Sequence, residues 1–228
     1  MIAVSINGIK GALVQVYARV SFVLVGKRRP KIFCIGFNKT GTTSIHRALI
    51  REGVLVGDQR VAERLTDDYL NGIVDPLLKF CNTAQAFQDS PFSLTNTYRH
   101  LFNNYPDAKF ILTIRDDPDT WYDSQLNFAA KRLGHTPRLE DLKRSTYSSL
   151  GWSYRVHEYL YGAHTEFEDR KTKTDVYEKH IREVKDFFRE RKGNLLVLNL
   201  KEEDAFARFC SFVGIRSRHD AFPWANKT

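Results

Sequence analysis

A glycine-rich turn near the start of the chain contains the residues best suited to bind a phosphate group. The segment 36–43 (GFNKTGTT) follows a short apolar run and precedes a helical pattern. Successive backbone N–H groups in such a turn converge on one point, and the helix N-terminus adds about half a positive charge. The turn therefore predicts an anion-binding site at the start of a helix.

The lysine of this turn is displaced from the position that it has in nucleoside triphosphate loops. Gly36 and Gly41 match the G-x-x-x-x-G frame, but Thr42 stands where the lysine should follow the second glycine. Lys39 lies within the turn, closer to the atom that joins the first phosphate to its substituent. Three classes remain open at this point: a P-loop kinase with Asp116 as a magnesium ligand, another group transferase, and a non-catalytic module that binds an anion or a membrane.

Arg115 is a second candidate for contact with an anion. It directly follows the apolar run KFILTI (109–114), which has the pattern of a buried strand. A desolvated arginine needs an anionic partner. That partner is either a phosphate group or one of the nearby carboxylates, which are Asp116, Asp117 and Asp119.

Strands that alternate with helices predict an α/β fold with a parallel sheet. We expect the strands at 31–36, 84–87, 109–114 and 195–200, and a mostly helical, aromatic-rich region at 138–190. Such sheets bind ligands at the carboxyl ends of their strands, where the glycine-rich turn and Arg115 lie. No internal repeat or linker is evident, so the sequence favours one domain.

The sequence resembles the sulfotransferases over about residues 31–226. GFNKTGTTSIHRAL is similar to their 5′-phosphosulfate-binding loop (P-K-S-G-T-T), and KFILTIRDDPDTWYDS to their 3′-phosphate-binding strand and helix. The resemblance implies a three-layer, P-loop-NTPase-like α/β fold with a central parallel sheet and an additional helical half that binds the acceptor. It also implies 3′-phosphoadenosine-5′-phosphosulfate (PAPS) as donor, 3′,5′-ADP (PAP) as product, and no required metal.

The resemblance also assigns roles to residues. In this chain the donor-binding positions would be Asn38, Lys39, Thr40, Gly41, Thr42, Thr43, Arg115 and Ser124. Ser124 follows Arg115 by nine positions where eight is usual in the family, so a serine on the surface of the helix is the alternative for it. The catalytic residues would be Lys39, which meets charge on the oxygen that bridges sulfur and phosphate, and Asp89, as general base. Asp89 could instead cap a turn, in which case His100 and His157 come first as bases.

Residues 1–30 form a segment that the resemblance does not cover, and residues 31–228 would be a single sulfotransferase domain. The apolar run 11–26 is followed by Lys27, Arg28 and Arg29, which predicts a helix that packs on the domain or lies on a membrane surface through residues 1–29. Sixteen residues are few for a membrane span. We expect a cytoplasmic protein that is either associated with a membrane or free of it.

Composition narrows the partners. The net charge of +8 favours anionic ligands, but no basic run has the interleaved aromatic residues of a nucleic-acid arm. The acceptor is expected to be a small molecule, lipid or carbohydrate with a hydroxyl or amine group. Trp152, Tyr154, Tyr159, Tyr161 and Phe167 either pack in the core or line the site of an apolar acceptor. The three cysteines should be buried and reduced, and the histidines lack the spacing of metal ligands.

Overall fold

A computed structural model describes residues 16, 18–20 and 29–223. Its centre is a four-stranded parallel sheet in the order β2-β1-β3-β4. The strands are β1 (Ile32–Cys34), β2 (Ala86–Gln88), β3 (Lys109–Ile114) and β4 (Leu195–Asn199). β1 and β3 pair from Ile32 opposite Lys109, so both strands end at the same edge of the sheet. All four predicted strands are present, and β1, β2 and β4 are shorter than the apolar runs from which they were predicted.

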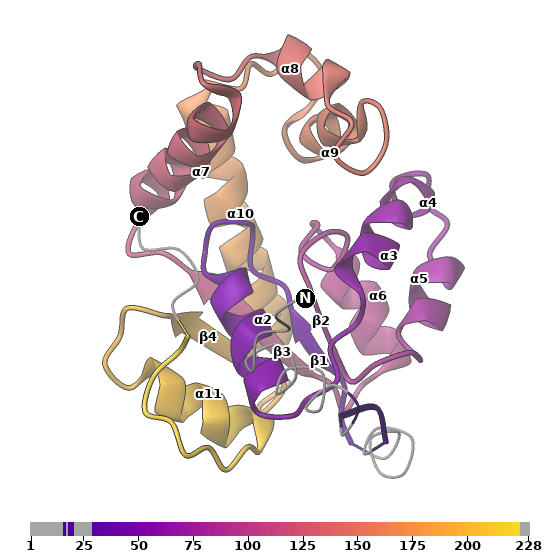
Figure 1. Cartoon of the computed structure of the whole chain (residues 1–228), viewed down its shortest axis with the longest axis vertical. Helices are drawn as coiled ribbons and strands as arrows, with labels where there is room; N and C mark the ends of the chain where they lie inside the picture. Colours follow the sequence, from indigo (N-terminus) through magenta and orange to yellow (C-terminus); the bar gives the residue numbers. More distant parts are fainter. Residues whose placement is uncertain (1–15, 17, 21–28, 224–228) are drawn as a thin grey trace, which may run out of the picture.

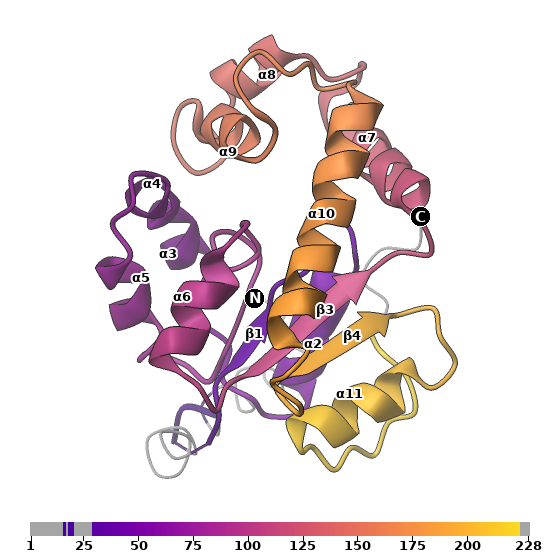
Figure 2. The same ribbon diagram turned by 180° about the vertical axis from the view of Figure 1, so that it is seen from behind.

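Helices cover both faces of the sheet, which gives the predicted three layers (Figures 1 and 2). On one face, Cys34 and Ile111 pack against α2 (Thr42–Arg51) and α11 (Ala205–Val213). On the other face, Phe33 and Phe110 pack in a second cluster with α5 (Asp75–Phe80), α6 (Thr97–Asn104) and α10 (Arg170–Phe188). Alternate residues of one strand thus face opposite layers, as the pleat of a strand requires.

The remaining helices extend beyond the carboxyl ends of the strands. They are α3 (Gln59–Arg64), α4 (Thr66–Leu70), α7 (Pro118–Leu133), α8 (Leu139–Arg144) and α9 (Trp152–Tyr161). Figure 1 shows α7, α8 and α9 at the top of the view, on the opposite side of the sheet region from α11. A small cluster of Phe37, Trp121, Tyr122 and Tyr177 joins α7 and α10 to the glycine-rich turn. The predicted helical half is therefore present, and it stands over the turn.

The three cysteines, Cys34, Cys81 and Cys210, are buried and free of disulfides, as predicted. Residues 16 and 18–20 are helical, and the rest of the predicted N-terminal helix lies outside the described residues. Within the described parts of the chain, no helix is both long and apolar enough to cross a membrane.

Candidate active site

The glycine-rich turn runs from the end of β1 to the start of α2 and is held against β3. A Cβ atom on Gly36 would lie 2.1 Å from Thr113 Oγ1 and 2.5 Å from the Thr113 carbonyl oxygen, so a glycine is needed here for close approach. Gly41 has a φ of 107°, which favours glycine, and it precedes α2 without a side-chain cap. The first amides of α2 are consequently left without a capping side chain.

Hydrogen bonds from α7 and from the residue that follows β3 fix the backbone of the turn. Trp121 Nε1 and Gln125 Nε2, both on α7, donate to the Asn38 carbonyl oxygen over 3.0 and 3.1 Å. Arg115 Nε donates to the Lys39 carbonyl oxygen over 2.6 Å. With these carbonyls held from outside, the turn keeps one conformation before any ligand binds.

Thr40 belongs to this support. Its hydroxyl donates to the Phe37 carbonyl oxygen and lies 2.5 Å from Thr113 Oγ1, and its N–H donates to the Phe37 carbonyl oxygen over 3.3 Å. Both donors of Thr40 are therefore engaged within the fold. Its predicted contact with the donor molecule would require these bonds to be exchanged.

Lys39 is half-buried in the turn, and its backbone φ is +70°. Its ammonium lies 3.9 Å from the centre of the Phe128 ring on α7. Burial lowers the pKa of Lys39, and the positive charge of Arg115 lowers it further. Because each of these two positive charges disfavours the other, an anion bound near both of them would be stabilised.

Arg115 directly follows β3, and each carboxylate that could have neutralised it has another partner. Asp116 pairs with Lys201 and accepts a hydrogen bond from Asn199. Asp117 caps α7 through the Thr120 N–H, and Asp119 pairs with Arg170. Among the described residues, Arg115 has no ion pair, so its two terminal nitrogens remain free to bind a ligand.

Ser124 lies on α7, and its Oγ is buried without a hydrogen-bond partner. Asp123, which occupies the position eight residues after Arg115, is exposed and paired with Arg170. A buried hydroxyl without a partner is unusual and suits a group that receives a ligand. Neither Ser124 nor Arg115 lines the cavity described below.

Asp89 directly follows β2 in a left-handed conformation with a φ of 63°. Its Oδ1 accepts a hydrogen bond from the Ser90 N–H over 2.9 Å. Burial raises the pKa of Asp89 to about 6, the Ser90 hydrogen bond opposes that rise, and the charge of Glu63 adds to it. A carboxyl group with such a pKa can accept a proton near neutral pH.

Glu63, on α3, is a second carboxylate of this region and is only 3% exposed. Its Oε1 accepts a hydrogen bond from the Tyr147 hydroxyl over 2.9 Å, whereas Oε2 has no hydrogen bond and its cation, Arg60, lies 3.6 Å away. Burial, followed by the hydrogen bond and charge of Glu63, raises the pKa of Tyr147 to about 12. Tyr147 thus remains a hydrogen-bond donor over the physiological range.

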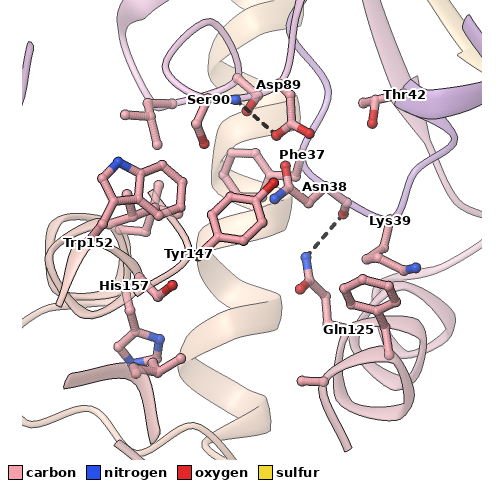
Figure 3. Close-up of a pocket in the computed structure, with 18 of the residues that line it drawn as sticks. Phe37, Asn38, Lys39, Thr42, Asp89, Ser90, Gln125, Tyr147, Trp152 and His157 are labelled. Carbon is pink, nitrogen blue, oxygen red and sulfur yellow. Dashed lines mark hydrogen bonds between the residues drawn. The ribbon is translucent and has the colours of Figure 1, made fainter. Parts of the chain in front are cut away.

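A cavity of about 410 Å³ brings several of the predicted residues together. They are Asn38, Lys39, Thr42, Thr43 and Asp89. In Figure 3, Asn38 and Lys39 lie on one side of the cavity and Trp152 and His157 on the other, with Tyr147 between them. The turn and the helical half therefore enclose one space, which is large enough for a small ligand.

The aromatic-rich stretch divides between the two predicted roles. Trp152, Tyr161 and Phe167 line the cavity, while Tyr154 and Tyr159 are not among its lining residues. Of the two alternative bases, His157 lines the cavity, and burial lowers its pKa. His100 is exposed on α6, beside Tyr69.

Comparison with known proteins identifies the class that this fold and site define. The four-stranded parallel sheet between two layers of helices, with a glycine-rich turn after β1, is the α/β architecture that the sequence predicts. The family profile described as "Sulfotransferase domain" matches residues 31–228, and the chain belongs to that family. The sulfotransferase family that the motifs predict is thus confirmed.

The chain was also compared with solved structures and with curated proteins. A solved sulfotransferase from Alicyclobacillus acidocaldarius is similar to the chain with 17% identity and a TM-score of 0.44, covering 88% of this chain and 86% of that one. No curated protein matches the chain.

Among the described residues, no group of histidine, cysteine or acidic side chains could hold a metal ion.

Sequence reasoning missed several polar residues that line the cavity, among them Glu63, Arg132, Tyr147 and Lys173. For Lys173 a signal existed, because it lies on the buried stripe of α10 with Tyr177, His180, Val184 and Phe188. Glu63 and Tyr147 belong to short segments without a clear periodicity. Only their position in the fold reveals them.

Proposed function

We propose that this protein transfers a sulfuryl group from PAPS to a hydroxyl or amine of an acceptor bound in the cavity. One observation carries the proposal. Arg115 holds the backbone of the Lys39 turn, keeps its own terminal nitrogens free, and lies with Lys39 at the carboxyl edge of the sheet. This arrangement suits a nucleotide with two separate anionic groups.

The donor would be held by the turn and by α7. The amides and hydroxyls of Thr42 and Thr43 would contact the 5′-phosphosulfate, and Arg115 and Ser124 the 3′-phosphate. The uncapped start of α2 and the buried, unpartnered Oγ of Ser124 fit these roles. When bound, PAPS would supply an activated sulfuryl group, and the residues of this chain would position it and stabilise developing charge.

Two residues would act on the reacting groups. Lys39 would stabilise negative charge on the oxygen that leaves sulfur, and Asp89 would take the proton of the acceptor. The raised pKa of Asp89 supports this assignment, because a carboxylate at its usual pKa is a weak base. Since the cavity contains both residues, donor and acceptor would meet there.

Calorimetric binding tests the donor class. We expect PAP to bind at micromolar concentration or below, in the presence of a metal chelator, and ADP and ATP to bind much more weakly. Arg115→Ala should weaken PAP by about 30- to 150-fold and 5′-AMP much less, because both ligands lose the support that Arg115 gives to the Lys39 turn but only PAP carries the 3′-phosphate. Tight ATP binding that requires magnesium, with no response to PAP, would contradict the proposal.

A further inference from the structure

Lys173 is a buried cation to which the proposed chemistry assigns no role. It lies on α10, is 3% exposed, and lines the cavity. Its ammonium lies 3.4 Å from the centre of the Phe167 ring and 5.3 Å from that of Tyr161. Among the described residues, no carboxylate lies within ion-pair distance of it and no group accepts a hydrogen bond from it.

The surroundings of Lys173 do not compensate its charge. Asp169, at the start of the same helix, uses its two carboxylate oxygens to bind the N–H and hydroxyl of Thr172. His157 and Tyr161 face Lys173 from α9, and burial holds both of them neutral by lowering the pKa of His157 and raising that of Tyr161. Phe167, on the loop before α10, contributes only the face of its ring. Burial lowers the pKa of Lys173 to about 7, and the charge of Asp169 opposes this only in part.

A desolvated ammonium without an anionic partner is unfavourable, and an anion that enters the cavity would relieve it. The aromatic rings around it, with those of Trp152 and Tyr147, would cover an apolar or aromatic body between this cation and Asp89. In Figure 3, Asp89 and His157 lie on different sides of Tyr147, so the two ends of the cavity are separate. The cavity therefore combines an end with a base and an end with a cation.

From this arrangement we infer that the acceptor is an apolar or aromatic hydroxyl compound with an anionic group, and that Lys173 binds this group while the hydroxyl lies at Asp89. The inference rests on the proposed function, because Asp89 is its reacting end. A carboxylate, a phosphate monoester and a sulfate monoester all carry negatively charged oxygens, and Lys173 would recognise this shared feature. Lys173 is thus the residue that determines acceptor specificity.

Calorimetry on the protein saturated with PAP tests the inference without turnover. The probes are 3-(4-hydroxyphenyl)propionate, its uncharged methyl ester, and 4-hydroxyphenyl phosphate. We expect the carboxylate or the phosphate to bind about 10- to 100-fold more tightly than the ester. The anion that binds more tightly identifies the kind of anionic group.

Two variants make the comparison specific. Lys173→Met keeps the length of the side chain in an apolar site, so it should fold, and it should abolish the preference for the anionic probes. Lys171→Met is the matched control. Lys171 lies on the same helix, is exposed, and pairs with Asp175. An equal affinity of native protein for ester and anions, or an unchanged preference in Lys173→Met, would overturn the inference.

A second measurement separates this inference from the proposed function. In protein with ¹³Cε-labelled lysine and no nucleotide, the Lys173 resonance should titrate near pH 7, and the carboxylate probe should raise its midpoint by about one pH unit. That shift requires neither PAP nor sulfuryl transfer. If PAP fails to bind but the shift occurs, the donor assignment is wrong and the anion site stands. If PAP binds and the midpoint does not move, the anion site is wrong.

Discussion

Lys39 has a left-handed backbone conformation, which side chains with a Cβ adopt at a cost of about 1 kcal/mol. The strain is maintained because Arg115 holds the carbonyl of Lys39 and α7 holds that of Asn38. The same contacts hold the backbone from which Lys39 reaches the lining of the cavity. Its position is thus determined by the fold before a donor binds.

Lys39→Ala should lower turnover by about 10²- to 10³-fold, the usual effect of losing one charge-stabilising donor. Lys39→Gly is the informative control, because glycine relieves the left-handed strain. We expect both variants to lose the same turnover and the glycine variant to be the more stable to urea. Normal turnover in either variant would remove Lys39 from the mechanism.

Asp89→Asn tests the general base. Asparagine also tolerates a positive φ and can still accept the Ser90 N–H, so fold and PAP affinity should stay intact. Turnover should fall by about 10²- to 10⁴-fold. In the native enzyme the carboxylate is the active form, so turnover should decline as the pH falls through about 6. If Asp89→Asn loses stability and keeps its turnover, Asp89 is a turn cap.

Glu63→Gln tests how the pKa of Asp89 is maintained. The charge of Glu63 contributes to the raised pKa of Asp89, so its removal should lower that pKa and move the acid limb of the pH–rate profile to lower pH. Glutamine keeps an acceptor for the Tyr147 hydroxyl. Tyr147→Phe, which removes the hydrogen bond and leaves the charge, is the control and should leave the limb in place. A limb that does not move in Glu63→Gln would exclude this coupling.

At the scale of elements, the sequence predicts what long apolar runs and turn residues specify. β3 and β4 follow from uninterrupted apolar runs, and α7 from Asp117 and Pro118, which cap and open it. The helices α3, α4 and α5 have only five or six residues each and mix polar with apolar positions. Such helices form through contacts with the rest of the fold, which no local pattern reports.

The junction of β1 and β3 is the element contact on which the site depends most. In Gly36→Ala the added Cβ would overlap Thr113, which should cost about 1–3 kcal/mol or more in urea denaturation and weaken PAP binding. The double variant with Thr113→Ala should not recover, since the carbonyl oxygen and N–H of residue 113 lie 2.5 and 2.7 Å from the new atom. Full recovery would mean that only the side chain of Thr113 limits residue 36.

For the whole molecule, the site joins segments that are far apart in the chain. The placement of Lys39 and Arg115 near one edge of the sheet was predictable, because each follows a strand and parallel strands end at the same edge. Glu63, Tyr147 and Lys173 reach the cavity from α3, from the segment between α8 and α9, and from α10. Their positions depend on how the helical half packs over the sheet, and neither composition nor spacing contains that information.

The combination of Asp89 and Lys173 in one cavity predicts a pH dependence that neither residue gives alone. Asp89 must be ionised to accept a proton, so activity requires a pH above about 6. Lys173 must be protonated to bind an anionic acceptor, so affinity in the free enzyme should fall above about 7. The kcat/KM for the anionic probe should therefore be highest between the pKa of Asp89 and that of Lys173, and it should fall at lower and at higher pH. Saturation with the acceptor raises the pKa of Lys173, so the alkaline limb of kcat should lie about one pH unit above that of kcat/KM, while the acid limb stays. In Lys173→Met the alkaline limb of kcat/KM should disappear. If that limb persists in the variant, another group controls the binding of the acceptor.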